Sequence, residues 1–203
     1  MATIQVSTTK IANRLLTYCE KRATEMSGID CFADLEGAKE QFATTREIWG
    51  KTDGLQAHHV VQSFKPGEVS PDKANEVGRK FAESFAKGHE VVIYTHTDKK
   101  HIHNHIVINS VNCDTGKKFH RGGVDKLREL RELSDTVCKE YDLSIVLEPS
   151  AEKRYARADF GLAKRGIVSW KDEIRDVIDL EKNKAKDLAE LQFNLSAKYN
   201  IDT

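Results

Sequence analysis

The 203-residue sequence has few cysteines, no net charge and no long apolar segment, and these absences exclude several classes of protein. Four cysteines, at positions 19, 31, 113 and 138, show no CxxC spacing, so neither a zinc ribbon nor a disulfide framework is indicated. No N-terminal segment resembles a signal peptide, and no run approaches the length of a membrane span. We therefore expect a cytoplasmic protein with reduced thiols and no membrane insertion.

One segment is rich in histidine, because half of the eight histidines fall within ten positions. They are His96, His101, His103 and His105. β-Branched, apolar runs flank them at 91–94 and 106–111, and such short runs predict buried strands. Side chains alternate along a strand, so the last three histidines share one face if the strand begins early enough.

Three imidazoles on one face of a core strand predict a metal site, since neutral imidazole is the commonest metal-ligating side chain. The alternative is a polar sheet face that happens to contain histidines. Residue chemistry leaves open which three histidines bind, and imidazoles accept several ions, Zn²⁺ and Ni²⁺ among them. Asp98 is placed to orient a ligating imidazole. Asn109 shares the strand parity of His103 and His105, so it either fixes a ligand or bonds the backbone.

The pattern His96-x-Asp98-x-x-His101-x-His103-x-His105-x-x-x-Asn109 resembles the histidine motif of plasmid mobilisation relaxases. These are the P-type class within the HUH endonucleases, named for a His-hydrophobe-His sequence on a central strand. Asn104 takes the place of the hydrophobe and leaves the alternation of histidines intact. The resemblance extends from about residue 12 to residue 147 and weakens after residue 149.

The resemblance implies a ligand set and a nucleophile. The class takes two ligands as His-x-His entering an apolar strand, which indicates His103 and His105, with His96 as the third ligand. His101 then becomes a near neighbour. The class carries its nucleophilic tyrosine near the N-terminus, in a context similar to that of Tyr18, which by spacing alone is an aromatic on one face of a helix. A Mg²⁺- or Mn²⁺-dependent reaction is also implied.

Periodicity and turn residues predict strands and helices in an order that does not strictly alternate. Expected strands are 3–6, 55–64, 91–94, 103–111 and 143–147, and expected helices are 10–26, 38–49, 70–87, 124–141 and 169–199. This order predicts an α+β fold, with helices packed on the faces of a central antiparallel sheet, as in HUH relaxases. His58 and His59 must face opposite sides of their strand, so at most one of them faces a metal.

We expect a relaxase domain at 1–149 and a basic arm with a C-terminal helical extension at 150–203. Two clusters of basic residues on this neutral chain predict binding to a DNA backbone. They are Lys117, Lys118, Arg121, Lys126 and Arg128 in the first, and Lys153, Arg154 and Arg157 in the second.

The predicted activity is site- and strand-specific nicking of DNA at a plasmid transfer origin (oriT). Attack by Tyr18 leaves a covalent 5′-phosphotyrosine and a free 3′-hydroxyl. The resemblance also implies an accessory mobilisation protein, a coupling ATPase and a longer full-length chain. Two other functions stay open: a metal-dependent phosphodiesterase that uses water, and a DNA-binding module with a structural metal. An adduct between protein and DNA that survives detergent distinguishes the first function from both.

Overall fold

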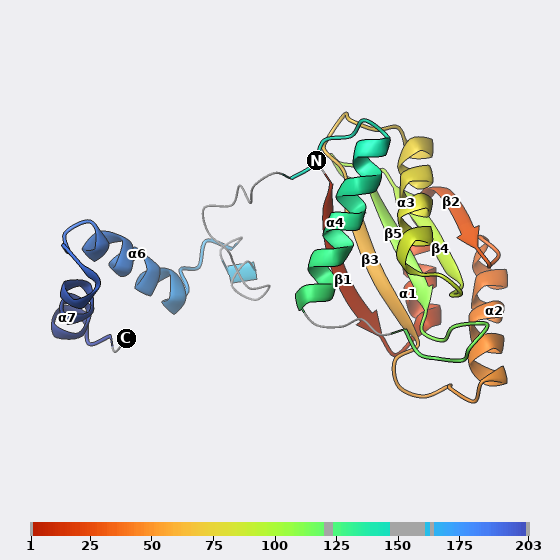
Figure 1. Ribbon diagram of the computed structural model, residues 1–203, viewed down its shortest axis with the longest axis horizontal. Helices are drawn as coiled ribbons and strands as arrows, with labels where there is room; N and C mark the ends of the chain where they lie inside the picture. The colour runs from red at the N-terminus through yellow and green to blue at the C-terminus, as the bar shows by residue number, and fades with distance from the viewer. Residues whose placement is uncertain (1, 120–123, 147–160, 163–164, 202–203) are drawn as a thin grey trace. The chain divides into compact units, whose positions relative to one another are not determined.

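The structure, a computed structural model, describes residues 2–119, 124–146, 161–162 and 165–201 (Figure 1). It divides into two compact units, Met1–Glu148 and Pro149–Thr203, and each is described by itself. Among the described residues, every helix is too short or too polar to span a membrane. The functional division into a nuclease domain and an extension stays a prediction.

The first unit is built on a sheet whose strand order is β1-β3-β5-β4-β2, with every neighbouring pair antiparallel. The strands are β1 (Thr3–Thr9), β2 (Ala23–Ile29), β3 (Ala57–Ser63), β4 (Val91–His96) and β5 (His103–Asn109). β4 and β5 are buried throughout, because their Val and Ile side chains pack on both faces of the sheet. The predicted α+β class is confirmed.

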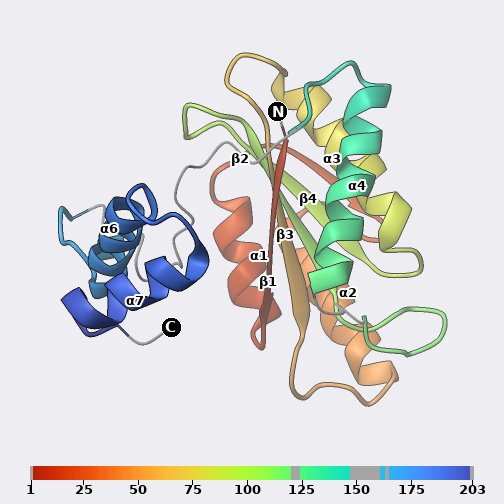
Figure 2. The same cartoon turned by 60° about the vertical axis from the view of Figure 1, so that its left-hand side comes forward.

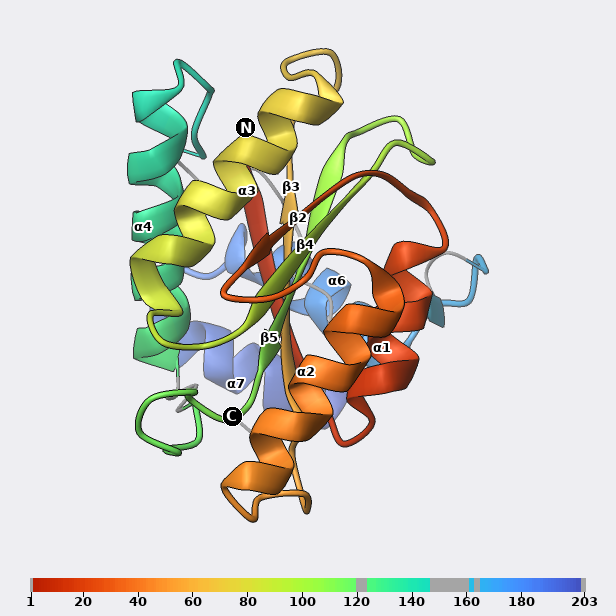
Figure 3. The ribbon, with the colours of Figure 1, turned by 90° about the vertical axis from the view of Figure 1, so that its right-hand side faces the viewer.

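Helices cover both faces of this sheet (Figure 3). The helices are α1 (Ala12–Glu20), α2 (Leu35–Ile48), α3 (Pro71–Phe85) and α4 (Val124–Glu140). We call the side of α1 and α2 the front face, and the side where α3 and α4 pack together the back face (Figure 2). Because α1 joins the two edge strands β1 and β2, it must cross the front face above the central strands.

The predicted N-terminal helix is correct only in its first half. α1 ends at Glu20, and residues 23–29 form the edge strand β2. Gly28, two residues beyond the expected end of the helix, lies inside that strand. A Cβ there would clash with the carbonyl oxygen of Cys31, so glycine permits a close approach of two backbone segments.

Two C-terminal predictions are also wrong. The expected strand at 143–147 is absent, since the described residues 143–146 are irregular, although Ala2 donates a backbone hydrogen bond to the Ser144 carbonyl. The expected single helix at 169–199 is two helices, α6 (Trp170–Lys182) and α7 (Leu188–Tyr199), in the second unit. The first of these helices begins with a capping box, in which the side chains of Ser169 and Asp172 cap each other's backbone.

Asn104, which replaces the hydrophobe of the histidine motif, is buried on the back face and fully bonded. Its Nδ2 donates to the Ala74 carbonyl at 2.6 Å, and its Oδ1 accepts from the Thr95 hydroxyl at 2.7 Å. Gly78 in α3 makes this possible, because a Cβ there would clash with the Asn104 amide. The amide therefore ties α3 to β5 and β4, and the histidines on either side stay on the front face.

Candidate active site

His96, His103 and His105 come together on the front face. His96 ends β4 and pairs with His103, which begins β5, while His105 follows two positions later and so faces the same side. One ring nitrogen from each of the three lies within 4.8 Å of the others. All three side chains are buried, so the rings are held in place before any metal arrives.

Hydrogen bonds leave one ring nitrogen available on each of two histidines. His96 Nε2 lies 2.5 Å from the Cys19 carbonyl oxygen, and His103 Nδ1 lies 3.3 Å from that of His101. Carbonyl oxygens only accept, so both nitrogens must carry the proton, which leaves His96 Nδ1 and His103 Nε2 with lone pairs. Such bonding of the second nitrogen is typical of metal-binding histidines, and the residues present therefore fit a divalent ion.

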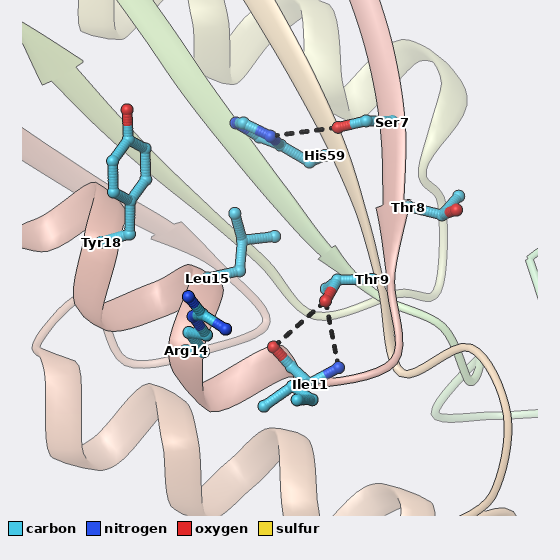
Figure 4. Close-up of a pocket in the computed structure, with 8 residues that line it drawn as sticks. All are labelled: Ser7, Thr8, Thr9, Ile11, Arg14, Leu15, Tyr18 and His59. Atoms are coloured by element: carbon cyan, nitrogen blue, oxygen red, sulfur yellow. Dashed lines mark hydrogen bonds between the residues drawn. The ribbon is translucent and has the colours of Figure 1, made fainter.

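His105 is held by a neighbouring imidazole. Its Nδ1 lies 2.7 Å from Nε2 of His59 on β3, and the two rings stack with centroids 5.0 Å apart. His59 Nδ1 in turn lies 3.3 Å from the Ser7 hydroxyl on β1 (Figure 4). If His105 Nδ1 donates, its Nε2 is left for a metal, and a chain of side chains on three strands would orient His105 for that role.

Burial favours the neutral form of His59, His103 and His105, and the neutral imidazole is the form that binds metal. It lowers the pKa of His59 to about 4, with a smaller contribution from His96. Burial also lowers the pKa of His105 to about 2, with further lowering by the neighbouring histidines. The pKa of His103 is lowered as well, again first by burial. At His59, His103 and His105 a proton therefore competes less with a metal for the ring lone pair than it would at an exposed imidazole.

The other three residues considered as ligands or supports lie in different positions. Asp98 pairs with Arg22 at 3.1 Å, and its second oxygen lies 3.9 Å from His103 Nε2, beside the nitrogen offered to a metal. His101 precedes β5 and belongs to neither metal-competent group found among the described residues. Asn109 lies at the end of β5 that is away from the three histidines. Its Nδ2 donates a hydrogen bond to Glu90 at 2.6 Å.

Tyr18 lies beside this cluster. Its ring meets that of His105 edge-on, with centroids 5.9 Å apart, yet 54% of the residue is exposed. Its neighbours Leu16 and Cys19 face the sheet and are fully buried, so the helix is fixed while Tyr18 stays accessible. Among the other tyrosines, Tyr94 is the nearest to the histidines in sequence and is the alternative candidate for the nucleophile. It is fully buried, however, and burial raises its pKa.

Among the described residues of the first unit, the remaining tyrosine is Tyr141, which packs against the back-face core and so lies away from the cluster. Tyr141 bonds Glu76 through its hydroxyl, and Tyr199 bonds Glu181 within the second unit. Tyr155 lies outside the described residues.

Two hollows adjoin Tyr18. One, of about 350 Å³, lies between α1 and the strands β1 and β3, and Figure 4 shows Tyr18 and His59 on either side of it. The other, of about 420 Å³, is lined by Arg14, Lys21 and Lys39 together with Tyr18. Arg14 lines both hollows, so a negatively charged polymer that passes Tyr18 would contact a cation in each of them and polar residues of the sheet in the first.

A family model of the relaxase nuclease domain, MobA/VirD2-like, matches residues 12–143, which is more than half of the chain. The chain belongs to this relaxase family. The predicted resemblance is therefore confirmed, and the matched residues include both Tyr18 and the histidine cluster.

Curated relaxases are similar to the chain over most of its length. A protein named rlx from Staphylococcus aureus is 46% identical over 200 residues, which cover 98% of this chain and 62% of that protein. A second rlx from the same species is 47% identical over 179 residues, covering 88% of this chain and 53% of its own. The chain thus spans little more than half the length of these relatives.

Solved structures share the fold at low sequence identity. The MobM relaxase domain bound to a 26-nucleotide pMV158 oriT DNA has a TM-score of 0.56 and 11% identity, covering 77% of this chain and 97% of that one. A Mn-bound MobM relaxase domain with 22-nucleotide oriT DNA at pH 4.6 has a TM-score of 0.56 and 10% identity, covering 79% and 98%. At this identity the likeness shows that the relaxase fold is shared.

Among the residues that the structure describes, the basic residues predicted to bind DNA are not beside the three histidines. Lys118 bonds the carbonyls of Asp53 and Leu55, near the end of the sheet opposite to His103. Lys117 is exposed in the same turn. Lys126 and Arg128 are on α4, which packs on the back face, and they pair with glutamates of the same helix. Four further residues lie outside the described residues: Arg121, Lys153, Arg154 and Arg157.

The structure adds three residues to which sequence analysis gave no site role: Cys19 through its carbonyl, Ser7 through its hydroxyl, and Arg14. The contacts of these residues are made with distant parts of the chain, and a local sequence pattern does not predict which residues a helix or a neighbouring strand will face. Adjacent His58 and His59 do face opposite sides, as predicted, with His58 against Phe119 on the back face.

We expect His59→Ala to weaken Mn²⁺ binding by roughly 10–100-fold, the usual effect of losing a group that orients a metal ligand. The reason is that His105 loses the partner that fixes its ring and its tautomer. Calorimetric titration measures the affinity. His59→Gln, which keeps a hydrogen-bonding group, should recover part of the loss, while His58→Gln serves as the adjacent control. Equal affinities for His59→Ala and the unmodified chain would contradict this role.

Proposed function

We propose that the chain nicks one DNA strand at a plasmid transfer origin by attack of the Tyr18 hydroxyl on a phosphodiester. The Tyr18 oxygen forms a bond to phosphorus, and the bond from phosphorus to the 3′-oxygen breaks. The products are a 5′-phosphotyrosyl protein–DNA adduct and a free 3′-hydroxyl, which takes up a proton. The step exchanges one phosphodiester for another, so it can run backwards and rejoin the strand.

One observation carries this proposal: an accessible tyrosine lies directly beside three buried histidines that share one face. A packing residue would be buried, as Leu16 and Cys19 are, whereas Tyr18 is open to two hollows. The family supports the assignment, and so does the oriT DNA bound by the MobM relaxase domain. A nucleophile must lie close to the reacting phosphorus and in line with the leaving group.

His96, His103 and His105 would hold a divalent ion, for which Mg²⁺ and Mn²⁺ are proposed. Bound there, the ion supplies positive charge that neutralises a phosphate oxygen, since three neutral imidazoles cancel none of it. The histidine rings contribute fixed positions, and burial shields them from water. Tyr18 contributes the attacking oxygen, and α1 sets its approach.

The experiment that tests this function uses a supercoiled plasmid carrying the matching oriT, incubated with the chain and Mn²⁺. We expect conversion to the open-circular form, with protein attached to the 5′ end after denaturation in SDS, so that kinase cannot label that end. Open circles with a free 5′ end would instead indicate hydrolysis by water. Binding without any nicking would indicate a DNA-binding module. The accessory protein and coupling ATPase implied by the family stay predictions.

We expect the cations beside Tyr18 to hold the DNA backbone. Arg14 and Lys21 line the hollow next to Tyr18, and no ion pair of either is found among the described residues. Removing one cation that binds a phosphate should reduce the slope of log affinity against log salt by about one unit. The double variant Arg14→Ala/Lys21→Ala should therefore lower the slope by about two units, measured by fluorescence anisotropy with labelled oriT oligonucleotide.

The matched control is Lys126→Ala/Arg128→Ala, which removes the same charge from α4 on the back face. This control also tests the prediction from sequence that the stretch after residue 116 binds DNA. If the α4 variant lowers the slope and the α1 variant does not, the DNA follows the back face and the assignment to Arg14 and Lys21 is wrong.

A further inference from the structure

A second group of potential metal ligands overlaps the three histidines. Ligand atoms of Cys19, His59 and His105 lie within 4.8 Å of one another. Tetrahedral zinc with sulfur and nitrogen ligands needs separations of roughly 3.5 Å, which small side-chain rotations would reach. Cys19 is on α1 and faces the sheet, His59 is on β3 and His105 on β5, so the group is assembled by three elements of the fold.

We propose that Cys19, His59 and His105 form a separate site for a thiophilic divalent ion, Zn²⁺ above all, which removes His105 from the three-histidine set. A thiolate with two imidazoles is a donor set that zinc prefers and that Mg²⁺ and Mn²⁺ do not. The Cys19 thiol loses its proton to the buffer on binding, and the ion keeps one position open for water.

The shared ligand makes the two sites mutually exclusive. A neutral imidazole has one lone pair and one proton, so it can bind one ion. The His105 Nδ1 atom faces His59 at 2.7 Å, and a zinc ion between these rings replaces that hydrogen bond. With its lone pair used at Nδ1, His105 carries its proton on Nε2 and no longer serves His96 and His103. Through Cys19, the ion would also be bound to α1 at the position next to Tyr18.

Zinc is thus expected to inhibit the nuclease by binding beside the catalytic metal site. Binding at Cys19 rests on the geometry alone, whereas inhibition of nicking rests also on the proposed function. The two are therefore measured separately, on the same chain.

Binding is followed with Co²⁺, a spectroscopic substitute for zinc whose bond to a thiolate gives an intense near-ultraviolet charge-transfer band. We expect the unmodified chain to show this band and Cys19→Ser to lose it. Cys138→Ser is the matched control, because it removes an equally buried thiol from α4 on the back face and should keep the band. Circular dichroism verifies folding, and Cys19→Ala replaces Cys19→Ser if the latter does not fold.

Inhibition is measured as Mn²⁺-dependent nicking at increasing Zn²⁺. Losing even a group that only orients a ligand weakens metal binding roughly 10–100-fold, so removal of the Cys19 ligand should raise the half-inhibiting zinc concentration at least about tenfold. No band in the unmodified chain, or a band that persists without Cys19, would overturn the site. Equal zinc sensitivity of Cys19→Ser and Cys138→Ser would overturn the shared ligand. Absence of nicking at any metal concentration would count against the proposed function and leave the spectra to decide the site.

Discussion

Tyr18→Phe will abolish nicking and adduct formation while the protein remains folded and still binds oriT DNA. The substitution removes one oxygen from a side chain that is 54% exposed, so the free energy of unfolding should change by no more than about 0.5 kcal/mol. Loss of the attacking oxygen should have a much larger effect on the reaction rate, and we expect the rate of nicking to fall on the order of 10⁴-fold or more. Plasmid nicking, oligonucleotide binding and thermal unfolding measure the three properties.

Mass spectrometry of the trapped adduct identifies the modified residue directly. Tyr94→Phe is the control, since Tyr94 is fully buried and its hydroxyl has no hydrogen-bond partner among the described residues. That variant should nick at close to the normal rate. A nucleotide found on Tyr94 or Tyr155, or a Tyr18→Phe protein that still nicks, would refute the assignment and leave the metal site standing.

His103→Ala should abolish tight binding of Mn²⁺, whereas His101→Ala should keep most of it. In the proposed site His103 offers Nε2 to the metal from a buried, hydrogen-bonded ring, so its removal should cost at least about 100-fold in affinity. His101 accepts the hydrogen bond from His103 through its backbone carbonyl, which alanine retains, and its ring only lies beside that of His103 with centroids 5.4 Å apart. The His101 variant should therefore bind within about twofold of the unmodified chain.

Calorimetric titration with Mn²⁺ measures both affinities, and thermal unfolding without metal checks that each variant is folded. The ranking of the two variants decides the question. Retained binding in His103→Ala together with abolished binding in His101→Ala would move the ligand set toward the start of the motif.

The histidine motif is predictable from sequence because it is local. β-Branched residues indicate a strand, a strand alternates, and alternation brings His103 and His105 to one face. The pairing of His96 with His103 needs only a hairpin between consecutive strands. The edge strand β2 was missed because its residues, ATEMSGI, are only half buried and lack the β-branched run of a core strand.

What depends on distant parts of the chain could not be predicted from sequence. Lys117 and Lys118 follow the histidines closely along the chain, but β5 runs away from His103, so these lysines lie near the other end of the sheet. The Cys19 carbonyl reaches His96 across 77 positions, and no periodicity encodes that hydrogen bond. The residues of α1 and β1 that contact the site can be identified only when the order of the strands in the sheet is known.

The path of α1 between the two edge strands has a consequence for local stability. Edge strands have neighbours on one side only, so β1 and β2 are the strands from which amide hydrogen exchange should begin, whereas β5 is paired on both sides and should open last. Because α1 is connected directly to both edge strands, local opening that begins at β1 or β2 should reach α1 and Tyr18 before it reaches the histidines of β4 and β5. The proposed nucleophile is therefore carried by the less protected part of the fold, and the proposed metal ligands lie in its most protected part.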